Sequence, residues 1–153
     1  MALGSFYTYF DSKDAIFRAL VQDMSESVKV AAREAISPDM RPLEIERAAL
    51  QAFLEFAGEH KEVYRIIDEA EFVDPRSYRD HYETVATRIR ERLEAGTKAG
   101  DYRDGLGDIE AWALMGMNVF LGLRFAIWRE EGDPASNAVA KAANIMLSDG
   151  ISR

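Results

Sequence analysis

The chain has 153 residues and no cysteine, which excludes disulfide bonds and thiolate metal sites. Its 27 acidic and 19 basic residues give a net charge of −8, and this balance argues against a strong nucleic-acid-binding surface on the chain as a whole. The longest apolar-rich stretch, residues 111–128, is interrupted by Asn118 and Arg124, so we expect no membrane span. Together these features predict one helical domain in the cytoplasm.

The N-terminal segment concentrates aromatic side chains. Phe6, Tyr7, Tyr9 and Phe10 lie within five residues. Rings of this size need a surface to bury against. The segment is therefore either a frayed apolar terminus or one part of a larger packed unit.

Helices separated by clear breaks are predicted along the rest of the chain. A first helix runs from about residue 14 to 36, a second from 42 to 58, and a third carries the apolar residues between 63 and 72. Asp74 followed by Pro75 marks the start of a fourth helix, because a capping residue precedes proline at the first helical position. A glycine-rich turn ends it, and a fifth helix (108–131) and a sixth (135–147) follow.

The fifth predicted helix is apolar on nearly all sides between Ile109 and Trp128. Such a helix is buried on two faces in a soluble protein, and a chain of this length covers only one of them. We therefore expect a homodimer in which the fifth and sixth helices of two copies form a four-helix bundle. The expected interface side chains are Leu114, Met117, Leu121, Phe125, Trp128, Val139, Ala142 and Met146.

The first residues carry a motif that points to a family. The run Gly4-Ser5-Phe6-Tyr7-Thr8-Tyr9-Phe10, followed by Asp11-Ser12-Lys13, resembles the end of the helix-turn-helix in TetR-type transcriptional repressors. In that family a short recognition helix leads through a turn into a long helix that opens with Ser-Lys. The resemblance implies an all-α fold, namely a TetR-like helical ligand-binding and dimerisation domain with a remnant of the helix-turn-helix at the N-terminus.

On this resemblance, residues 1–11 are the end of the DNA-binding unit and residues 12–153 are the regulatory domain. The two preceding helices of the family are expected upstream of Met1, so the DNA-binding head is incomplete. The residues that the resemblance assigns to DNA contact in a complete head are Ser5, Tyr7, Thr8, Tyr9 and Lys13. For the chain as given we expect no measurable sequence-specific DNA binding.

The resemblance also implies a small-molecule pocket enclosed by the middle helices. Candidate lining residues combine apolar bulk with hydroxyl, indole or amide groups, which suits a ligand site; the alternative is a core filled by large side chains. These candidates are Phe53, Phe56, Tyr64, Tyr78, Tyr82, Trp112, Met115 and Asn118. Nearby, the acidic cluster of Asp68, Glu69 and Glu71 is either a counter-charge for a cationic ligand or a solvated helix face.

No catalytic or metal-binding pattern is found in the sequence. The two histidines, His60 in a bend and His81 on an expected exposed face, lack partners at the spacing of helical metal ligands. Nucleophile-elbow and phosphate-binding glycine motifs are also missing. We therefore expect a protein that is not an enzyme and that binds neither metal nor cofactor.

The resemblance implies a ligand-responsive transcriptional repressor. Its partners would be a second copy of the chain, an unknown small-molecule effector and, in a full-length form, operator DNA; no membrane partner is expected. One alternative is a stand-alone helical dimer that binds small molecules or lipids without binding DNA. Another is an accessory protein that handles lipids or quinones, since the TetR-like fold also serves that purpose.

Overall fold

The computed structural model describes residues 13–153, and all the regular elements in this part of the chain are helices. They are α2 (Lys13–Glu34), α3 (Pro42–Glu59), α4 (Lys61–Val73), α5 (Pro75–Lys98), α6 (Asp108–Gly122), the short π-helix η1 (Leu123–Ile127) and α7 (Ser136–Ile151). The predicted all-α fold is confirmed, with the predicted number and order of helices.

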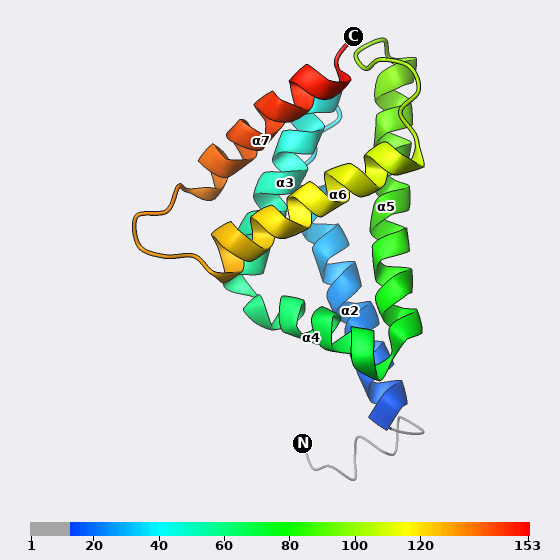
Figure 1. Cartoon of the computed structure of the whole chain (residues 1–153), viewed down its shortest axis with the longest axis vertical. Helices are drawn as coiled ribbons and strands as arrows, with labels where there is room; N and C mark the ends of the chain where they lie inside the picture. The colour runs from blue at the N-terminus through cyan, green and yellow to red at the C-terminus, as the bar shows by residue number, and fades with distance from the viewer. Residues whose placement is uncertain (1–12) are drawn as a thin grey trace.

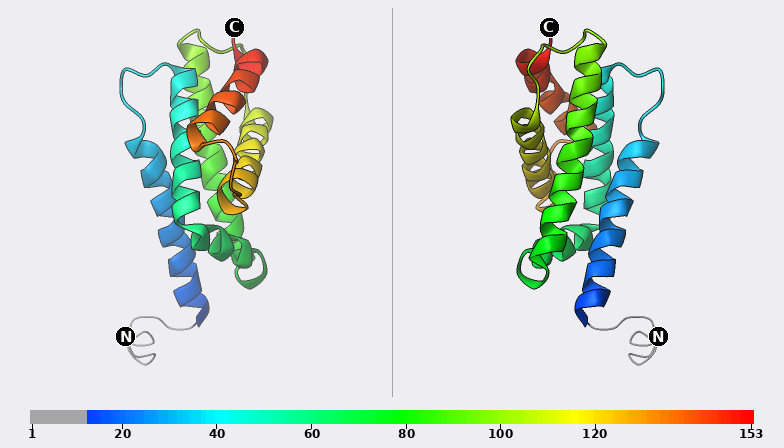
Figure 2. Two further views of the ribbon diagram at one scale, coloured as in Figure 1. Left: turned by 90° about the vertical axis from the view of Figure 1, so that its left-hand side faces the viewer. Right: turned by 90° about the vertical axis from the view of Figure 1, so that its right-hand side faces the viewer.

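The helices enclose a wedge-shaped body. In Figure 1, α4 crosses its lower end, α5 rises along one edge, and α6 runs diagonally between α5 and α3. The side views show α7 beside α3, and α2 along the opposite edge of the molecule (Figure 2). Five helices, α2 to α6, therefore surround a common interior.

The α4–α5 corner is fixed by Asp74, as the sequence predicted. Its carboxylate accepts hydrogen bonds from the Ser77 backbone N–H (3.4 Å) and the Ser77 hydroxyl (2.7 Å), with Pro75 at the first position of α5. Arg18 of α2 donates from Nε to the same carboxylate at 2.9 Å. These bonds hold the pKa of Asp74 below its usual value, the Ser77 hydroxyl bond contributing most. One side chain thus caps α5 and attaches α2 to the corner.

The last two helices differ in length from the prediction. The fifth was expected to continue to residue 131, but after Gly122 it widens into η1, and the Trp128 N–H donates to the Leu123 carbonyl at 2.9 Å. The last helix extends beyond the predicted end at residue 147 to Ile151, whose carbonyl accepts from the Arg103 N–H at 2.8 Å. This contact with the α5–α6 loop stabilises a helix end that carries no local stop signal.

The loop after α5 carries the largest fully buried side chain, Tyr102, which is completely inaccessible to solvent. Its ring fills the space beside Gly96, and a Cβ atom at position 96 would overlap the ring. Tyr102 joins Ile89, Leu93 and Leu114 in one of two core clusters, between α5 and α6. The loop is therefore packed into the core.

Candidate ligand cavity and exposed helix face

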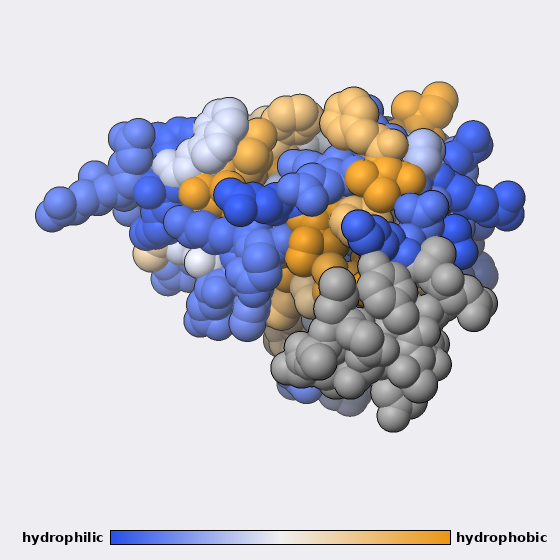
Figure 3. Space-filling view, turned by 90° about the horizontal axis from the view of Figure 1, so that it is seen from below, coloured by the Kyte–Doolittle hydropathy of each residue, from blue (hydrophilic) through white to orange (hydrophobic). Residues whose placement is uncertain are grey.

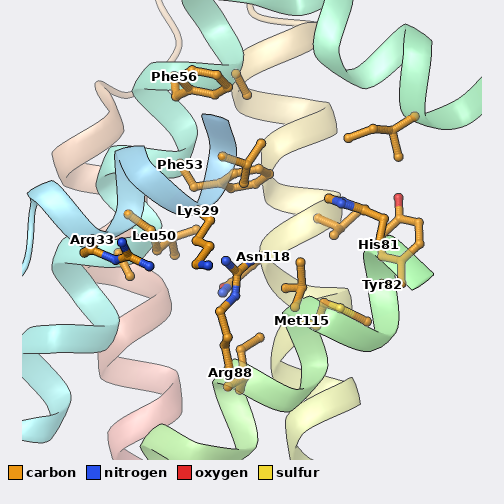
Figure 4. A pocket seen from close by; sticks show the side chains of 18 of the residues that line it. Lys29, Arg33, Leu50, Phe53, Phe56, His81, Tyr82, Arg88, Met115 and Asn118 are labelled. Carbon is orange, nitrogen blue, oxygen red and sulfur yellow. The ribbon is translucent and has the colours of Figure 1, made fainter. Parts of the chain in front are cut away.

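A cavity of about 420 Å³ lies between α2, α3, α4, α5 and α6. Its volume falls in the range of small-molecule sites, roughly 300–1,000 Å³. Most of the wall is aliphatic or aromatic, and Figure 4 shows Phe53, Phe56, Tyr82 and Met115 around the space. The cavity is a candidate site for a mainly apolar molecule.

Six of the eight predicted pocket residues lie on this wall, namely Phe53, Phe56, Tyr64, Tyr82, Met115 and Asn118. The structure does not bring Tyr78 or Trp112 to the cavity. The Tyr78 ring packs edge-on against Tyr82 at 5.0 Å between centroids, outside the wall. Trp112 follows the fully buried Ala111 by one residue, about 100° around the helix, and is 41% exposed.

Gly122 leaves room for the Tyr64 side chain of α4 against the end of α6. A Cβ atom at Gly122 would overlap the Tyr64 hydroxyl and approach the Phe53 ring to 2.9 Å. In this position the Tyr64 hydroxyl donates to the Val119 carbonyl at 3.0 Å. Burial raises the pKa of Tyr64 well above its usual value, so the phenol stays protonated. This part of the wall already has its polar groups paired.

His81 is buried on the cavity wall, so the prediction of an exposed face was wrong. The chain packs α2 against this side of α5, and His81 Nδ1 lies 2.7 Å from the Ser25 hydroxyl. Burial, and then the positive charge of Arg88, lowers the pKa of His81 to about 4. The imidazole is therefore neutral near pH 7.

Basic side chains from α2 and α5 also line the cavity, and the sequence analysis missed them: Lys29, Arg33, Arg88 and Arg92. Arg92 donates from Nε and Nη2 to the buried Glu46 carboxylate of α3, at 2.7 and 3.2 Å. Burial would lower the pKa of Arg92, but Glu46 outweighs it and the net shift is upward. The sequence feature that could have indicated them is the spacing of Arg88 and Arg92, which lie one helical turn apart and beside the apolar Val85 and Ile89.

The acidic cluster is largely solvated. Glu69 and Glu71 are exposed and do not line the cavity, whereas Asp68 lies at its edge. Burial, and then Glu71, raises the pKa of Asp68. Within residues 13–153 no group of three side chains could hold a metal ion.

Helices α6 and α7 and the residue after η1 expose large apolar side chains, which we call the outer face: Ile109, Trp112, Phe120, Trp128, Ile145 and Met146. Ile109 is 81% exposed, and Phe120 and Met146 are each 70% exposed. Isolated apolar residues are common on protein surfaces, but a group of this kind marks an interaction site.

The register of this face differs from the prediction. Leu114 and Val139, expected in the interface, lie in the chain's own core at 6% exposure each. Met117, Leu121 and Phe125 are half-buried against that core. The remaining predicted interface residues, Trp128, Ala142 and Met146, are exposed. Because α6 is apolar on both sides, the neighbouring helices decide which side turns inward.

The stretch Asp108–Ile127 is also long and apolar enough to cross a membrane, by length and composition alone, and 28% of it is buried in the fold. The expectation that the chain spans no membrane stays a prediction, because a core helix of a globular protein can meet the same criteria. Within the fold this stretch packs against α3 and α5.

The predicted DNA-contact residues Ser5, Tyr7, Thr8 and Tyr9 lie outside the described residues, as does the proposed boundary at residue 11. Lys13 is exposed at the first position of α2. The face seen from below (Figure 3) combines apolar patches with hydrophilic flanks. In this region α4 ends with the exposed Phe72 and Val73.

No protein-family model matches the chain. It is 23% identical over 154 residues to the uncharacterized HTH-type transcriptional regulator YhgD of Bacillus subtilis (strain 168), covering 97% of this chain and 79% of that protein.

Solved structures with a similar fold include the ketosteroid transcriptional regulator KstR2 of Mycobacterium tuberculosis (TM-score 0.71, 21% identity, 100% of this chain and 80% of that one). A TetR family transcriptional regulator from Chloroflexus aurantiacus J-10-FL has a TM-score of 0.76 and 22% identity, over 100% of this chain and 79% of that one. A TetR-like transcriptional regulator from Rhodococcus sp. RHA1 has 26% identity and a TM-score of 0.66, over 97% of this chain and 79% of that one. The predicted resemblance to TetR-type regulators is confirmed in the fold.

Proposed function

We propose, from the TetR-type fold of the chain, that it is the regulatory and dimerisation part of a ligand-responsive transcriptional repressor acting in the cytoplasm. The observation that carries the proposal is the cavity of about 420 Å³. Its wall includes Val28 and Ala32 of α2, the helix that follows the helix-turn-helix-like segment in sequence, and Ile36 directly after that helix. A ligand in the cavity therefore contacts the helix that leads to the proposed DNA-reading segment.

The packing of α2 supports this route. Of its 22 residues only Val21 is buried. Most of its other side chains are only partly buried or exposed, and a shift of the helix would rearrange its contacts between Arg18 and Asp74 and between Ser25 and His81. A ligand that binds one position of α2 more tightly than another changes the population of the two positions, and with it DNA binding.

Dimerisation is proposed through the outer face. Its side chains on α6 and α7 form an apolar surface that a second copy, related by two-fold symmetry, would cover. The revised interface is centred on Ile109, Phe120 and Met146. Analytical ultracentrifugation at micromolar concentration tests this: we expect a dimer, and a monodisperse monomer would contradict it. Flotation with lipid vesicles tests the alternative that the apolar stretch binds a membrane. If the protein floats with the vesicles, the proposed interface is contradicted.

Repressor function is tested in the organism that encodes the chain, with an epitope tag at the C-terminus of the chromosomal gene. Chromatin immunoprecipitation should enrich one or a few promoter sites, and deletion of the gene should raise their transcription. Lys13→Ala should reduce enrichment at all sites alike, because a phosphate contact carries no base specificity. A uniform immunoprecipitation signal without discrete sites would favour the alternative, a stand-alone dimer that binds small molecules. The net charge of −8 favours the same alternative.

A further inference from the structure

The charges on the cavity wall are unevenly distributed. Four basic residues come from α2 and α5, whereas the acidic residues on the wall are Asp68 and Glu91. Asp68 acts electrostatically on Tyr64, Tyr78 and Tyr82, at the α4 side. The cavity therefore has a basic side and a side rich in tyrosine.

Arg88 has no counter-ion in direct contact with it on the basic side. Arg92 is neutralised by Glu46, and Lys29 Nζ lies 3.6 Å from Glu26. Within residues 13–153 the Arg88 side chain takes part in no ion pair or hydrogen bond. Burial lowers the pKa of Arg88, and the positive charges of Arg92 and Arg33 lower it further, while the negative charge of Glu26 opposes part of this shift. A half-buried cation without a partner is costly, and an anion beside it would reduce that cost.

Asn118 provides a second polar group without a partner. Its Oδ1 atom is buried and accepts no hydrogen bond from the protein. Rotation of the amide would present its NH₂ group as a donor instead. In Figure 4 the Lys29 and Arg88 side chains extend from different helices toward the part of the cavity where Asn118 lies. Three nitrogen-bearing groups thus converge on one position.

Two polar groups elsewhere on the wall already have protein partners. Tyr64 donates to a backbone carbonyl, and His81 is bonded to Ser25. The surfaces they leave are mostly aromatic and aliphatic, including the Phe53 ring, 5.9 Å from the Tyr64 ring. The positively charged donors of the wall are therefore confined to the basic side.

We propose that the cavity binds an apolar molecule that carries one anionic group, a carboxylate or a phosphate. The anion lies against Arg88, with Lys29 and Asn118 beside it, and the apolar part lies between α3, α4 and α6. This inference rests on the proposed function, since it names the class of effector. It is tested by direct binding without DNA, so its failure is distinguishable from a failure to find an operator.

Isothermal titration calorimetry with four probes of equal chain length tests the head group: decanoate, decyl phosphate, decan-1-ol and decyltrimethylammonium. A charge-assisted hydrogen bond corresponds to about 10-fold or more in affinity. Decanoate or decyl phosphate should therefore bind at least about 10-fold more tightly than decan-1-ol, with decyltrimethylammonium the weakest. The ratio between the two anions identifies the type of head group. Equal affinities, a preference for the cation, or no binding of any probe would overturn the proposal.

Variants locate the anion within the cavity. Arg88→Gln should abolish the preference for the anionic probes over decan-1-ol, while Arg88→Lys should keep part of it. Arg76→Gln, an exposed arginine on the same helix, is the matched control and should behave as wild type. Circular dichroism checks folding, which Arg88→Gln should preserve because Arg88 is unpaired. If the anion preference survives in Arg88→Gln, the assignment is overturned.

Discussion

The two sides of α6 meet very different surroundings. The inward side, with Met115, borders a cavity whose wall is held by buried polar contacts such as that between Arg92 and Glu46. The outward side, with Ile109 and Phe120, is apolar and exposed. Substitutions that break these buried contacts should therefore change folding, whereas substitutions on the outer face should change association.

The largest expected effect is on the cavity wall. Arg92→Met leaves the buried Glu46 carboxylate without its partner, and we expect the free energy of unfolding to fall by about 3–5 kcal/mol in urea denaturation. The double variant Arg92→Met with Glu46→Leu is the control. Replacing both ions by apolar groups should recover most of the loss. A single variant as stable as wild type would show that the wall does not depend on this pair.

Acid should weaken the same region through His81. Its pKa is lowered to about 4 in the fold from 6.5, so between these values the unfolded chain binds more protons than the folded chain. Stability is then lost as the pH falls from 6.5 toward 4, by about 3 kcal/mol. Unfolding measured across this window for wild type and His81→Gln isolates the contribution. Parallel pH curves for the two proteins would contradict it.

On the outer face, Phe120→Glu should weaken association about 100-fold, because two symmetry-related charges would enter an apolar interface. Sedimentation equilibrium gives the dissociation constant, and circular dichroism should show an unchanged fold. Thr84→Glu adds the same charge at an exposed position of α5 away from this face, and should leave association unchanged. Loss of helicity in Phe120→Glu would mean that the outer face also supports the fold.

The smallest effects come from two glycines on α6. Gly122→Ala should destabilise the chain by about 1–3 kcal/mol, since the added methyl group overlaps Tyr64. Nothing lies within 4 Å of a Cβ atom at Gly116, so Gly116→Ala should stabilise the helix by about 0.5–1 kcal/mol. Thermal unfolding compares the two. If Gly116→Ala instead weakens the dimer, a second chain must lie close to this position.

The helices could be predicted because their boundaries are local. Pro42 and the Asp74–Pro75 step act through backbone geometry and capping, which depend only on neighbouring residues. The inward side of α6 could not be predicted, because Leu114 and Phe120 are similarly apolar. When both sides of a helix are apolar, the spacing of apolar residues does not indicate which side faces the core. Only packing against α5 and α3 separates them.

The cavity was predictable in its aromatic part and not in its charged part. Phe53 and Tyr64 have a size and polarity that suggest a ligand site on their own. In the sequence alone, Arg88 is indistinguishable from a solvated arginine. Its position in the cavity depends on how α2 lies across α5. Glu46 likewise becomes a buried partner only when α3 and α5 meet.

The fit between Tyr102 and Gly96 has an evolutionary consequence. Any side chain at position 96 collides with the ring, and a smaller residue at position 102 leaves a hole where the ring was. Each single replacement therefore passes through a destabilised protein, whereas a paired exchange can preserve the volume. In an alignment of true relatives, a glycine at 96 should accompany an aromatic residue at 102, and the two positions should change together.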